Sequence, residues 1–344
     1  MKRIVKIQIA LAVSLLIAGG FFAYFIFNQI YGGLEEVSVD EQVSVDEVFY
    51  KVIDGTIASK ENKNLMPIAI MIENHIDSRP QFGLSKASVV YEVLTEATIT
   101  RFLAIYDLSE NIEKIGPVRS ARSYFVDLAG EYGALYVHCG GSPEAVSRLK
   151  YDNFVINLDE FFGYNSGYFY RDNNKYAPHN LFTSSDLLSE AKLHYQLNED
   201  INLATWNFKD GLSEGDQPKE IKINYSQTSS HQVAWKYDPN INKYERWQNN
   251  SRHVDNDGTI IEADNVIIQF ANTYIVDEVG RKRIDLIGEG RLVVFRDGVV
   301  IEGNWKREDA YSRTFFYDFE GDEIELNRGK IWIQVVPTDM EIEY

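Results

Sequence analysis

The stretch GPVRSARSYFVDLAGEYGALYVHCGGSPEAV, residues Gly116–Val146, carries the pattern that decides the fold of the first half of the chain. Apolar residues recur at helical spacing between Ala121 and Tyr132, and the apolar run Ala134–Cys139 that follows predicts a strand. Ser142 then supplies an N-cap, with proline and glutamate in the next two positions, so a second helix is expected to begin there. Helices that alternate with a strand indicate an α/β layer arrangement.

Three apolar runs upstream predict further strands of the same domain. They span Pro67–Glu73, Ser88–Leu94 and Ile99–Leu108. The first run is continuously apolar up to its final glutamate, which is typical of a strand that is covered on both faces. We therefore predict an N-terminal α/β domain with a mixed sheet over residues 65–205.

The second half of the chain, residues 206–344, is rich in strand patterns. Turn signals at Asp257-Gly258, Asp297-Gly298 and Glu320-Gly321 separate its apolar runs. The predicted fold class is therefore α+β, with a strand-rich C-terminal domain after the α/β domain. Four tryptophans of this half are expected either to pack in its core or to form a carbohydrate-stacking platform: Trp235, Trp247, Trp305 and Trp332.

The N-terminus predicts a membrane anchor. Lys2, Arg3 and Lys6 precede an apolar run, Ile9–Phe27, which has roughly the length needed to cross a bilayer. Basic residues before the run and acidic residues after it predict a cytoplasmic N-terminus and extracytoplasmic domains. We expect residues 1–30 to be a transmembrane signal anchor that crosses the plasma membrane once; a cleaved signal peptide is the alternative.

An acidic segment, residues 31–64, follows the predicted anchor. It contains the motif VSVDE twice, at residues 37–41 and 43–47. Because neighbouring carboxylates repel one another, we expect an extended spacer that holds the domains away from the membrane. No cysteine lies near the end of the apolar run, so we expect no lipid-modified N-terminus.

The net charge and the single cysteine exclude some kinds of partner and site. The formal net charge of −18 argues against nucleic acid as a partner, because duplex binding requires a basic face. Any anion site must then be a local basic pocket on an acidic body. The only cysteine, Cys139, cannot form an internal disulfide, and we expect it to be a small buried residue and not a nucleophile.

Four arginines are the candidate anion-binding residues: Arg101, Arg119, Arg122 and Arg171. Arg119 and Arg122 are three residues apart at the start of a predicted helix, so their side chains can converge on one point. Arg171 lies in a tyrosine-rich loop. Guanidinium groups bind phosphate or carboxylate through two parallel hydrogen bonds, which suits an anionic ligand. Internal salt bridges are the alternative role for these side chains.

Arg101 is unusual because it lies within an apolar strand pattern. An unpaired guanidinium is costly there, so Arg101 must pair with Glu73, Glu92 or Glu96, or face a site. Three polar residues are expected to support the anion site from nearby positions: Glu96, His138 and Asn180.

The turn Gly140-Gly141-Ser142 is the second part of the predicted anion site. A helix N-terminus presents free N–H groups and the positive end of its dipole, and both favour an anion. Glycines also permit close approach of a ligand to the backbone. A Gly-Gly pair before a capped helix is equally common as a plain turn. The arginines one helix upstream favour the binding role.

His179 and Glu73 are the candidates for a general base, should the site catalyse a reaction. His138 ends a strand pattern and is expected to satisfy a backbone group. No HxxxH or CxxC spacing is present, so we expect no metal and no cofactor. The chain also lacks a GxSxG motif, a P-loop and a dinucleotide fingerprint.

Several of these stretches resemble the YerB-like family of exported bacterial proteins. They include PIAIMIENHIDSRPQFGLSKASVVYE, GPVRSARSYFVDLA and YAPHNLFTS in the first half, and DLIGEGRLVVFRDG and IELNRGKIWIQVV in the second. The resemblance covers about Met66–Pro337. It implies an N-terminal and a C-terminal family domain and an extracytoplasmic location, but no established reaction. Many relatives are lipoproteins, whereas this chain lacks the acceptor cysteine.

A looser resemblance connects PVRSARSYFVDL and YVHCGGSPEAV with LytR-CpsA-Psr enzymes, which transfer lipid-linked glycopolymers and hold pyrophosphate with arginines. Ser120 replaces the acid that follows the arginine in that pattern. Three hypotheses result. The first is an envelope protein that binds an anionic, phosphate- or carboxylate-bearing ligand. The second is a glycopolymer phosphotransferase, and the third is a structural partner of other envelope proteins.

Overall fold

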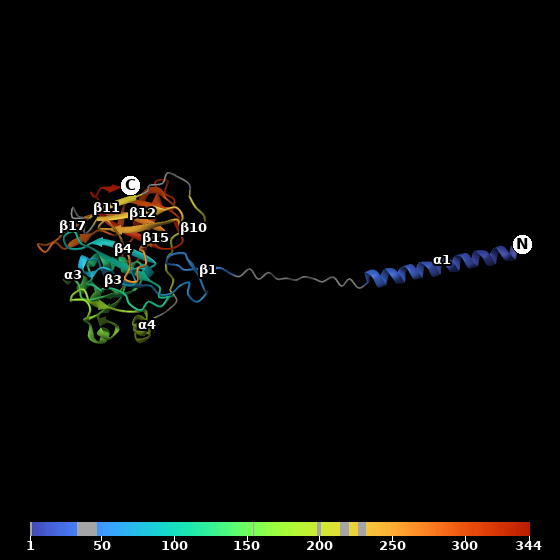
Figure 1. Ribbon diagram of the computed structural model, residues 1–344, viewed down its shortest axis with the longest axis horizontal. Coiled ribbons are helices and arrows are strands. Elements are labelled where there is room, and N and C mark those ends of the chain that lie inside the picture. The colour runs from blue at the N-terminus through green and yellow to red at the C-terminus, as the bar shows by residue number, and fades with distance from the viewer. Residues whose placement is uncertain (1, 33–46, 154, 198–200, 214–219, 226–231) are drawn as a thin grey trace. The chain divides into compact units, whose positions relative to one another are not determined.

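The computed structural model describes residues 2–32, 47–153, 155–197, 201–213, 220–225 and 232–344 (Figure 1). The chain divides into two compact units, Met1–Glu47 and Val48–Tyr344. Residues 48–64, which the sequence assigns to the spacer, therefore belong to the larger unit. Most of the repeated acidic motif lies within residues 33–46, outside the described residues.

The first unit contains helix α1 (Lys2–Tyr31). Among the residues that the structure describes, no helix combines the length and the apolar content that a membrane span requires. The predicted transmembrane anchor is therefore not supported.

The larger unit is built on a ten-stranded mixed sheet. The strands of its first half have side chains that are buried on both faces, as in β3 (Ile68–Glu73), β4 (Val89–Leu94) and β5 (Thr100–Tyr106). The strand order from edge to edge is β21 (Phe315–Asp318), β20 (Val299–Arg307), β19 (Gly288–Arg296), β16 (Asn265–Ala271), β23 (Ile331–Pro337), β4 (Val89–Leu94), β5 (Thr100–Tyr106), β3 (Ile68–Glu73), β6 (Leu135–His138) and β7 (Ile156–Asp159).

Helices cover one face of this sheet. Helix α2 (Ser123–Gly130) and helix α3 (Pro143–Tyr151) pack in one apolar cluster with Ala69 and Met71, which lie on the same face of β3. Ser142 caps α3 as predicted, because its Oγ accepts a hydrogen bond from the Ala145 N–H at 3.3 Å.

A second, smaller sheet covers the opposite face. Its strands alternate between buried and more exposed residues, and its buried side chains, such as Ile221 and Trp235, share a cluster with Ile68 and Ile70 of β3. Helix α4 (Ser185–His194) contributes to the same cluster. The sheet comprises β14 (Ser251–Arg252), β13 (Lys243–Gln248), β12 (Gln232–Asp238), β11 (Glu220–Asn224) and β24 (Ile342–Glu343), with β15 (Glu262–Ala263) paired to β13.

Short elements complete the unit. Three 3-10 helices are η1 (Ile76–Ser78), η2 (Leu84–Lys86) and η3 (Gly163–Tyr168). Four small strand pairs are β1 (Phe49–Tyr50) with β2 (Ile57–Ala58), β8 (Tyr170–Arg171) with β9 (Leu181–Phe182), β10 (Phe208–Lys209) with β22 (Leu326–Asn327), and β17 (Thr273–Ile275) with β18 (Lys282–Ile284).

Strands from the two halves of the sequence belong to the same sheet. Strand β23, near the C-terminus, pairs in parallel with β4 of the first half, with Trp332 opposite Val90. The mixed, sheet-rich α+β class is as predicted. Of the four tryptophans considered for a carbohydrate platform, three are buried in the core (Trp235, Trp305 and Trp332), and Trp247 is half-buried.

The strand directions define the edge at which the candidate residues gather. Strands β3 and β4 are each antiparallel to β5, so they run in the same direction, and β6, β7 and β23 run with them. Glu73 and His138 are the last residues of β3 and β6, and Glu96 follows β4. In open sheets of this kind, ligands bind outside the carboxyl ends of the strands.

Candidate functional site

A short segment, Pro117–Ala121, lies beside the carboxyl end of β3. The Glu73 N–H donates a hydrogen bond to the carbonyl oxygen of Pro117 at 3.0 Å, and the Arg119 N–H donates to that of Met71 at 2.9 Å. The Cys139 N–H, directly after β6, donates to the Arg119 carbonyl oxygen at 3.1 Å. The segment is therefore held between the ends of two strands, which fixes the position from which the Arg119 side chain projects.

Glu73 links two of the predicted site residues. Its Oε1 lies 3.0 Å from Nε of Arg119, and its Oε2 lies 2.8 Å from Nδ1 of His179. The Glu73 side chain is only 6% exposed, whereas those of Arg119 and His179 are 25% and 18% exposed. No described residue accepts a hydrogen bond from the two terminal nitrogens of Arg119. These nitrogens remain free to bind a ligand.

Arg101 is buried without a carboxylate partner among the described residues. Its Nη1 donates to the Ser120 carbonyl oxygen at 2.5 Å, and none of the three acids considered from sequence forms a salt bridge with it. Burial, together with the positive charges of Arg122 and Arg119, lowers the pKa of Arg101 to about 10. The three guanidinium groups are therefore close enough to repel one another.

Arg122 is the residue that precedes α2, and it pairs with Glu96. Its Nε lies 2.6 Å from the Glu96 Oε1, and its Nη1 donates to the Ala121 carbonyl oxygen at 2.7 Å. The site thus contains three guanidinium groups, from Arg101, Arg119 and Arg122, against the two carboxylates of Glu73 and Glu96. We call these three arginines the arginine cluster. Among the described residues, it has one more positive charge than its carboxylates neutralise.

Arg171 lies outside the arginine cluster. Its Nη2 lies 3.3 Å from Oε1 of Glu160, and its Nη1 donates to Oδ1 of Asn180 at 3.1 Å. No contact between described residues joins Arg171 to Arg101, Arg119 or Arg122. The structure therefore brings together three of the four predicted arginines. The fourth, Arg171, is hydrogen-bonded to Asn180 and lies apart from them.

The glycine corner, Gly140–Ser142, is occupied by contacts within the protein. The Gly140 N–H donates to Oδ1 of Asp159 at 2.7 Å, and the Ser142 N–H donates to the Ala121 carbonyl oxygen at 3.2 Å. Gly140 has a φ of +62°, and a Cβ there would lie 2.9 Å from the Phe161 ring. These contacts indicate a structural turn that starts α3.

His138 has a structural position. Its Nδ1 lies 2.9 Å from the Gly140 carbonyl oxygen and its Nε2 lies 2.7 Å from Oδ1 of Asn157. Burial lowers the pKa of His138 below that of an exposed histidine. Both ring nitrogens are used, in agreement with the expectation that His138 satisfies a backbone group.

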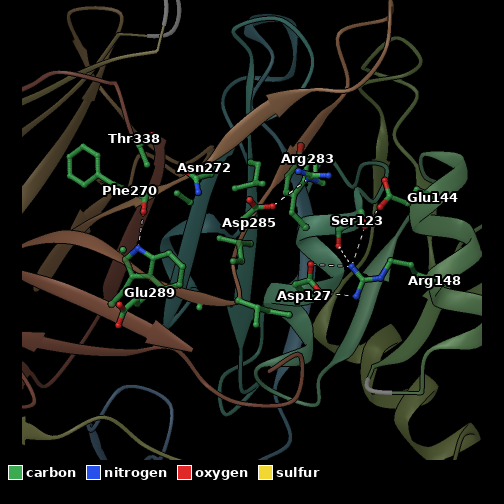
Figure 2. A pocket seen from close by; sticks show the side chains of 18 residues that line it. Ser123, Asp127, Glu144, Arg148, Phe270, Asn272, Arg283, Asp285, Glu289 and Thr338 are labelled. Atoms are coloured by element: carbon green, nitrogen blue, oxygen red, sulfur yellow. Dashed lines mark hydrogen bonds and ion pairs between the residues drawn. The ribbon is translucent and has the colours of Figure 1, made fainter. Parts of the chain in front are cut away.

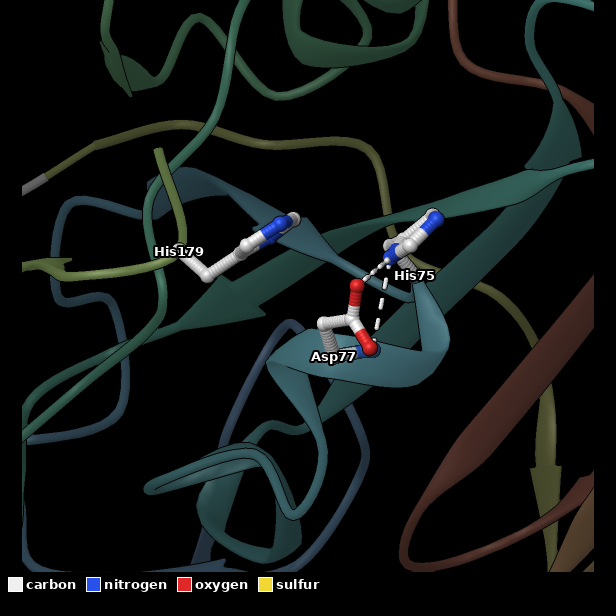
Figure 3. A group of neighbouring side chains, drawn as sticks. All are labelled: His75, Asp77 and His179. Carbon is white, nitrogen blue, oxygen red and sulfur yellow. Dashed lines mark hydrogen bonds and ion pairs between the residues drawn. The ribbon is translucent and has the colours of Figure 1, made fainter. Parts of the chain in front are cut away.

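Sequence reasoning missed two residues beside His179. His75 and Asp77 lie in the turn that follows β3, and the rings of His75 and His179 stack with their centroids 5.2 Å apart (Figure 3). His75 Nδ1 lies 3.5 Å from the Asp77 Oδ2. The available signal was the spacing Glu73-x-His75-x-Asp77, which places three polar residues at alternate positions immediately after an apolar run.

Comparison with known proteins places the chain in a family. Models of the DUF3048 N-terminal and C-terminal domains, both described as a protein of unknown function, match residues 54–197 and 221–333. "Putative lipoprotein YerB" of Bacillus subtilis (strain 168) is 33% identical over 277 residues, which covers 79% of this chain and 81% of the relative. The chain belongs to the DUF3048 family.

A solved structure supports the DUF3048 assignment. The crystal structure of YerB protein from Bacillus subtilis matches with a TM-score of 0.77 and 30% identity, over 86% of this chain and 100% of that chain. The YerB-like resemblance is thus confirmed. These matches do not show the looser similarity to LytR-CpsA-Psr enzymes.

This DUF3048 protein also has a pocket of about 540 Å³ beside α2 (Figure 2). Both arginines that line it are paired with aspartates of the same pocket. Arg148 binds both carboxylate oxygens of Asp127 at 2.7 and 3.0 Å, and Nε of Arg283 lies 3.4 Å from Oδ1 of Asp285. No member of the arginine cluster lines this pocket.

Cys139 is half-buried at the end of β6. Burial raises the pKa of its thiol to about 12, and the Glu160 carboxylate, whose Oε2 lies 3.4 Å from Sγ, contributes to the rise. A thiol with such a pKa is a poor nucleophile at neutral pH, as expected from the sequence.

Proposed function

We propose that this DUF3048 protein is an extracytoplasmic protein of the cell envelope that binds an anionic ligand at the arginine cluster. The ligand would carry a phosphate or carboxylate group, because both match the planar fork of a guanidinium. The extracytoplasmic location is supported by the name of the Bacillus subtilis relative, which describes a lipoprotein candidate. The proposal concerns binding and does not include a transfer reaction.

The observation that carries the proposal is the unpaired charge of Arg101. This side chain is buried, its hydrogen-bond acceptor is a neutral carbonyl oxygen, and two further guanidinium groups lie near it. A buried charge without a counterion costs several kcal/mol, and an anion bound between the three arginines would offset that cost. The free terminal nitrogens of Arg119 would supply hydrogen bonds to it.

Isothermal titration calorimetry of the full chain with pyrophosphate and with citrate tests the proposal. We expect one site per chain for at least one of these two anions. The double substitution Arg119→Ala and Arg122→Ala should weaken binding at least tenfold, because it removes two of the three guanidinium groups. Arg101→Met should also weaken binding without lowering the melting temperature, because it removes a buried charge that destabilises the folded chain when no anion is bound.

Arg171→Ala is the matched control, since Arg171 lies outside the arginine cluster. Its affinity for the anion should equal that of the unsubstituted chain. Two results would contradict the proposal: unchanged binding in the double variant, or a large fall in melting temperature of Arg101→Met. The second result would make Arg101 a structural group.

A further inference from the structure

We propose that His75, Asp77 and His179 bind one divalent transition-metal ion, and that Glu73 orients His179 for this role. The site goes beyond the proposed anion binding and does not depend on it. The sequence was expected to contain no metal site, because no short metal-binding motif is present. The three side chains come from two segments that are far apart in the sequence.

Local backbone structure brings the ligands together. His75 is the N-cap of η1, in an extended conformation with φ −63° and ψ 148°, and Asp77 is in the first turn of that helix. His179 lies in the loop before β9, and its ring stacks on that of His75 with an interplanar angle of 16°. Figure 3 shows the two rings and the Asp77 carboxylate around one space.

The three residues offer donor atoms at nearly the spacing that a metal ion requires. One donor atom from each residue lies within 4.8 Å of the other two. Two ligands on a tetrahedral zinc ion, with bonds of about 2.0–2.1 Å, are about 3.3 Å apart. The His75 Nδ1 and the Asp77 Oδ2, at 3.5 Å, already have this separation.

Rotation of the Asp77 side chain can shorten the distances of up to 4.8 Å between the donor atoms to those of a metal site. The Asp77 side chain is 68% exposed and can rotate freely, whereas the His75 side chain is 34% exposed and is held by its stacking on His179. The Asp77 N–H donates to the His75 Nδ1 at 3.3 Å, which is a long hydrogen bond that a metal could replace. Two imidazoles and one carboxylate leave a fourth position open for water or for an oxygen of an anion.

Glu73 provides a second, independent observation. Its buried carboxylate lies 2.8 Å from Nδ1 of His179, so Nδ1 carries the proton and donates it to the carboxylate. In that tautomer the lone pair of the ring is on Nε2, which has no hydrogen-bond partner among the residues that the structure describes and could bind the ion. Histidine ligands of metals are typically held in this way by a carboxylate on the other ring nitrogen.

Titration of the full chain, without an affinity tag, with ZnCl2 after EDTA treatment and dialysis tests the proposal. We expect one zinc ion per chain, measured by calorimetry and by elemental analysis of the dialysed protein. His75→Ala, Asp77→Asn and His179→Ala should each weaken binding at least tenfold. Glu73→Gln should weaken it by about tenfold to a hundredfold, because this carboxylate only orients a ligand.

His194→Ala is the control, because His194 is exposed on α4 and lies outside the proposed site. It should leave zinc affinity unchanged. Co2+ should give the visible absorption bands of a low-symmetry, nitrogen- and oxygen-bound ion, and these bands should be lost in His179→Ala. Absence of stoichiometric zinc binding, or an equal loss of affinity in His194→Ala, would overturn the proposal. Circular dichroism of each variant in EDTA checks that a lost signal is not an unfolded chain.

Discussion

Arg246 carries its charge in the interior of the protein, between the two sheets. Its Nη2 donates to both carboxylate oxygens of Glu92, at 2.9 and 2.8 Å, and both side chains are fully buried. Its Nη1 donates to Nδ1 of His253 at 2.7 Å, and Nε2 of His253 lies 2.8 Å from Oε1 of Gln81. Every member of this network has a defined donor or acceptor role, so His253 must be neutral.

The neutral state of His253 predicts a loss of stability in acid. Burial and the charge of Arg246 lower its pKa well below that of an exposed histidine. At a pH below about 6.5 the unfolded chain binds a proton that the folded chain does not, so the free energy of unfolding falls as the pH falls, by up to about 1.4 kcal/mol per pH unit. Urea unfolding at pH 7, 6 and 5 measures this slope.

His253→Gln replaces the titrating imidazole with an amide that can still form hydrogen bonds. The variant should be less stable at pH 7 than the unsubstituted chain, and its stability should fall less steeply between pH 7 and pH 5. Parallel pH profiles of the two chains would contradict the assignment of a neutral His253.

At the level of elements, the glycine corner illustrates how a turn can resemble a binding site. Asp159, at the end of β7, accepts hydrogen bonds from the Gly140 N–H at 2.7 Å and from the Phe161 N–H at 3.2 Å. Its carboxylate thus accepts the Gly140 N–H that the sequence offered as a donor for an anion. The corner joins β6, β7 and α3, and the acid that completes it belongs to the protein.

Asp159→Ala should therefore destabilise the fold without abolishing anion binding. Loss of two charge-assisted hydrogen bonds at a buried turn should cost about 2 kcal/mol in the free energy of unfolding. Chemical denaturation measures this cost. Asp152→Ala, which removes a more exposed ion pair with Arg148, is the control and should cost less than about 1 kcal/mol. Equal stability of Asp159→Ala and the unsubstituted chain would exclude this structural role.

At the level of the whole molecule, the two family domains share one sheet. The parallel pairing of β23 with β4 runs over five residue pairs, and the two apolar clusters on the faces of the sheet contain residues from both halves. Arg246 of the second half and Glu92 of the first half add a buried ion pair across the same junction. Each half therefore covers part of the apolar surface of the other.

We therefore expect the unit Val48–Tyr344 to unfold in one cooperative transition. All five tryptophans lie at position 206 or later, so tryptophan fluorescence reports on the second half, whereas calorimetry reports on the whole chain. The fluorescence midpoint should coincide with a single calorimetric peak for this unit, with equal calorimetric and van't Hoff enthalpies. A further calorimetric transition of the unit without a change in fluorescence would indicate that the halves unfold separately.

Local features of the fold could be predicted from the sequence, and long-range pairings could not. The strand expected over Pro67–Glu73 is β3, and the N-cap at Ser142 begins α3, because both depend on side chains within a few positions. The pairing of β23 with β4 joins segments more than 200 residues apart. Hydrophobic periodicity carries no information about such a partner.

The candidate site shows the same contrast between local features and long-range contacts. The sequence predicted that Arg119 and Arg122 lie close together, three positions apart at a helix entrance; in the structure both precede α2, which begins at Ser123, so helical spacing is not what brings them together. The contact between Glu73 and His179 joins residues 106 positions apart, and it depends on the loop before β9 reaching the end of β3. For this reason His75 and Asp77 were not associated with His179 until the fold was known.

The environment of Cys139 has a practical consequence for work on the protein. Because burial and the Glu160 carboxylate raise the pKa of its thiol to about 12, little thiolate is present at neutral pH, and we expect alkylating reagents and oxidants to react slowly with it in the folded chain. A cysteine introduced at an exposed position should therefore take up a maleimide dye selectively, without removal of the native residue. Fluorescence and spin labels can then be attached near the arginine cluster in an otherwise unaltered chain.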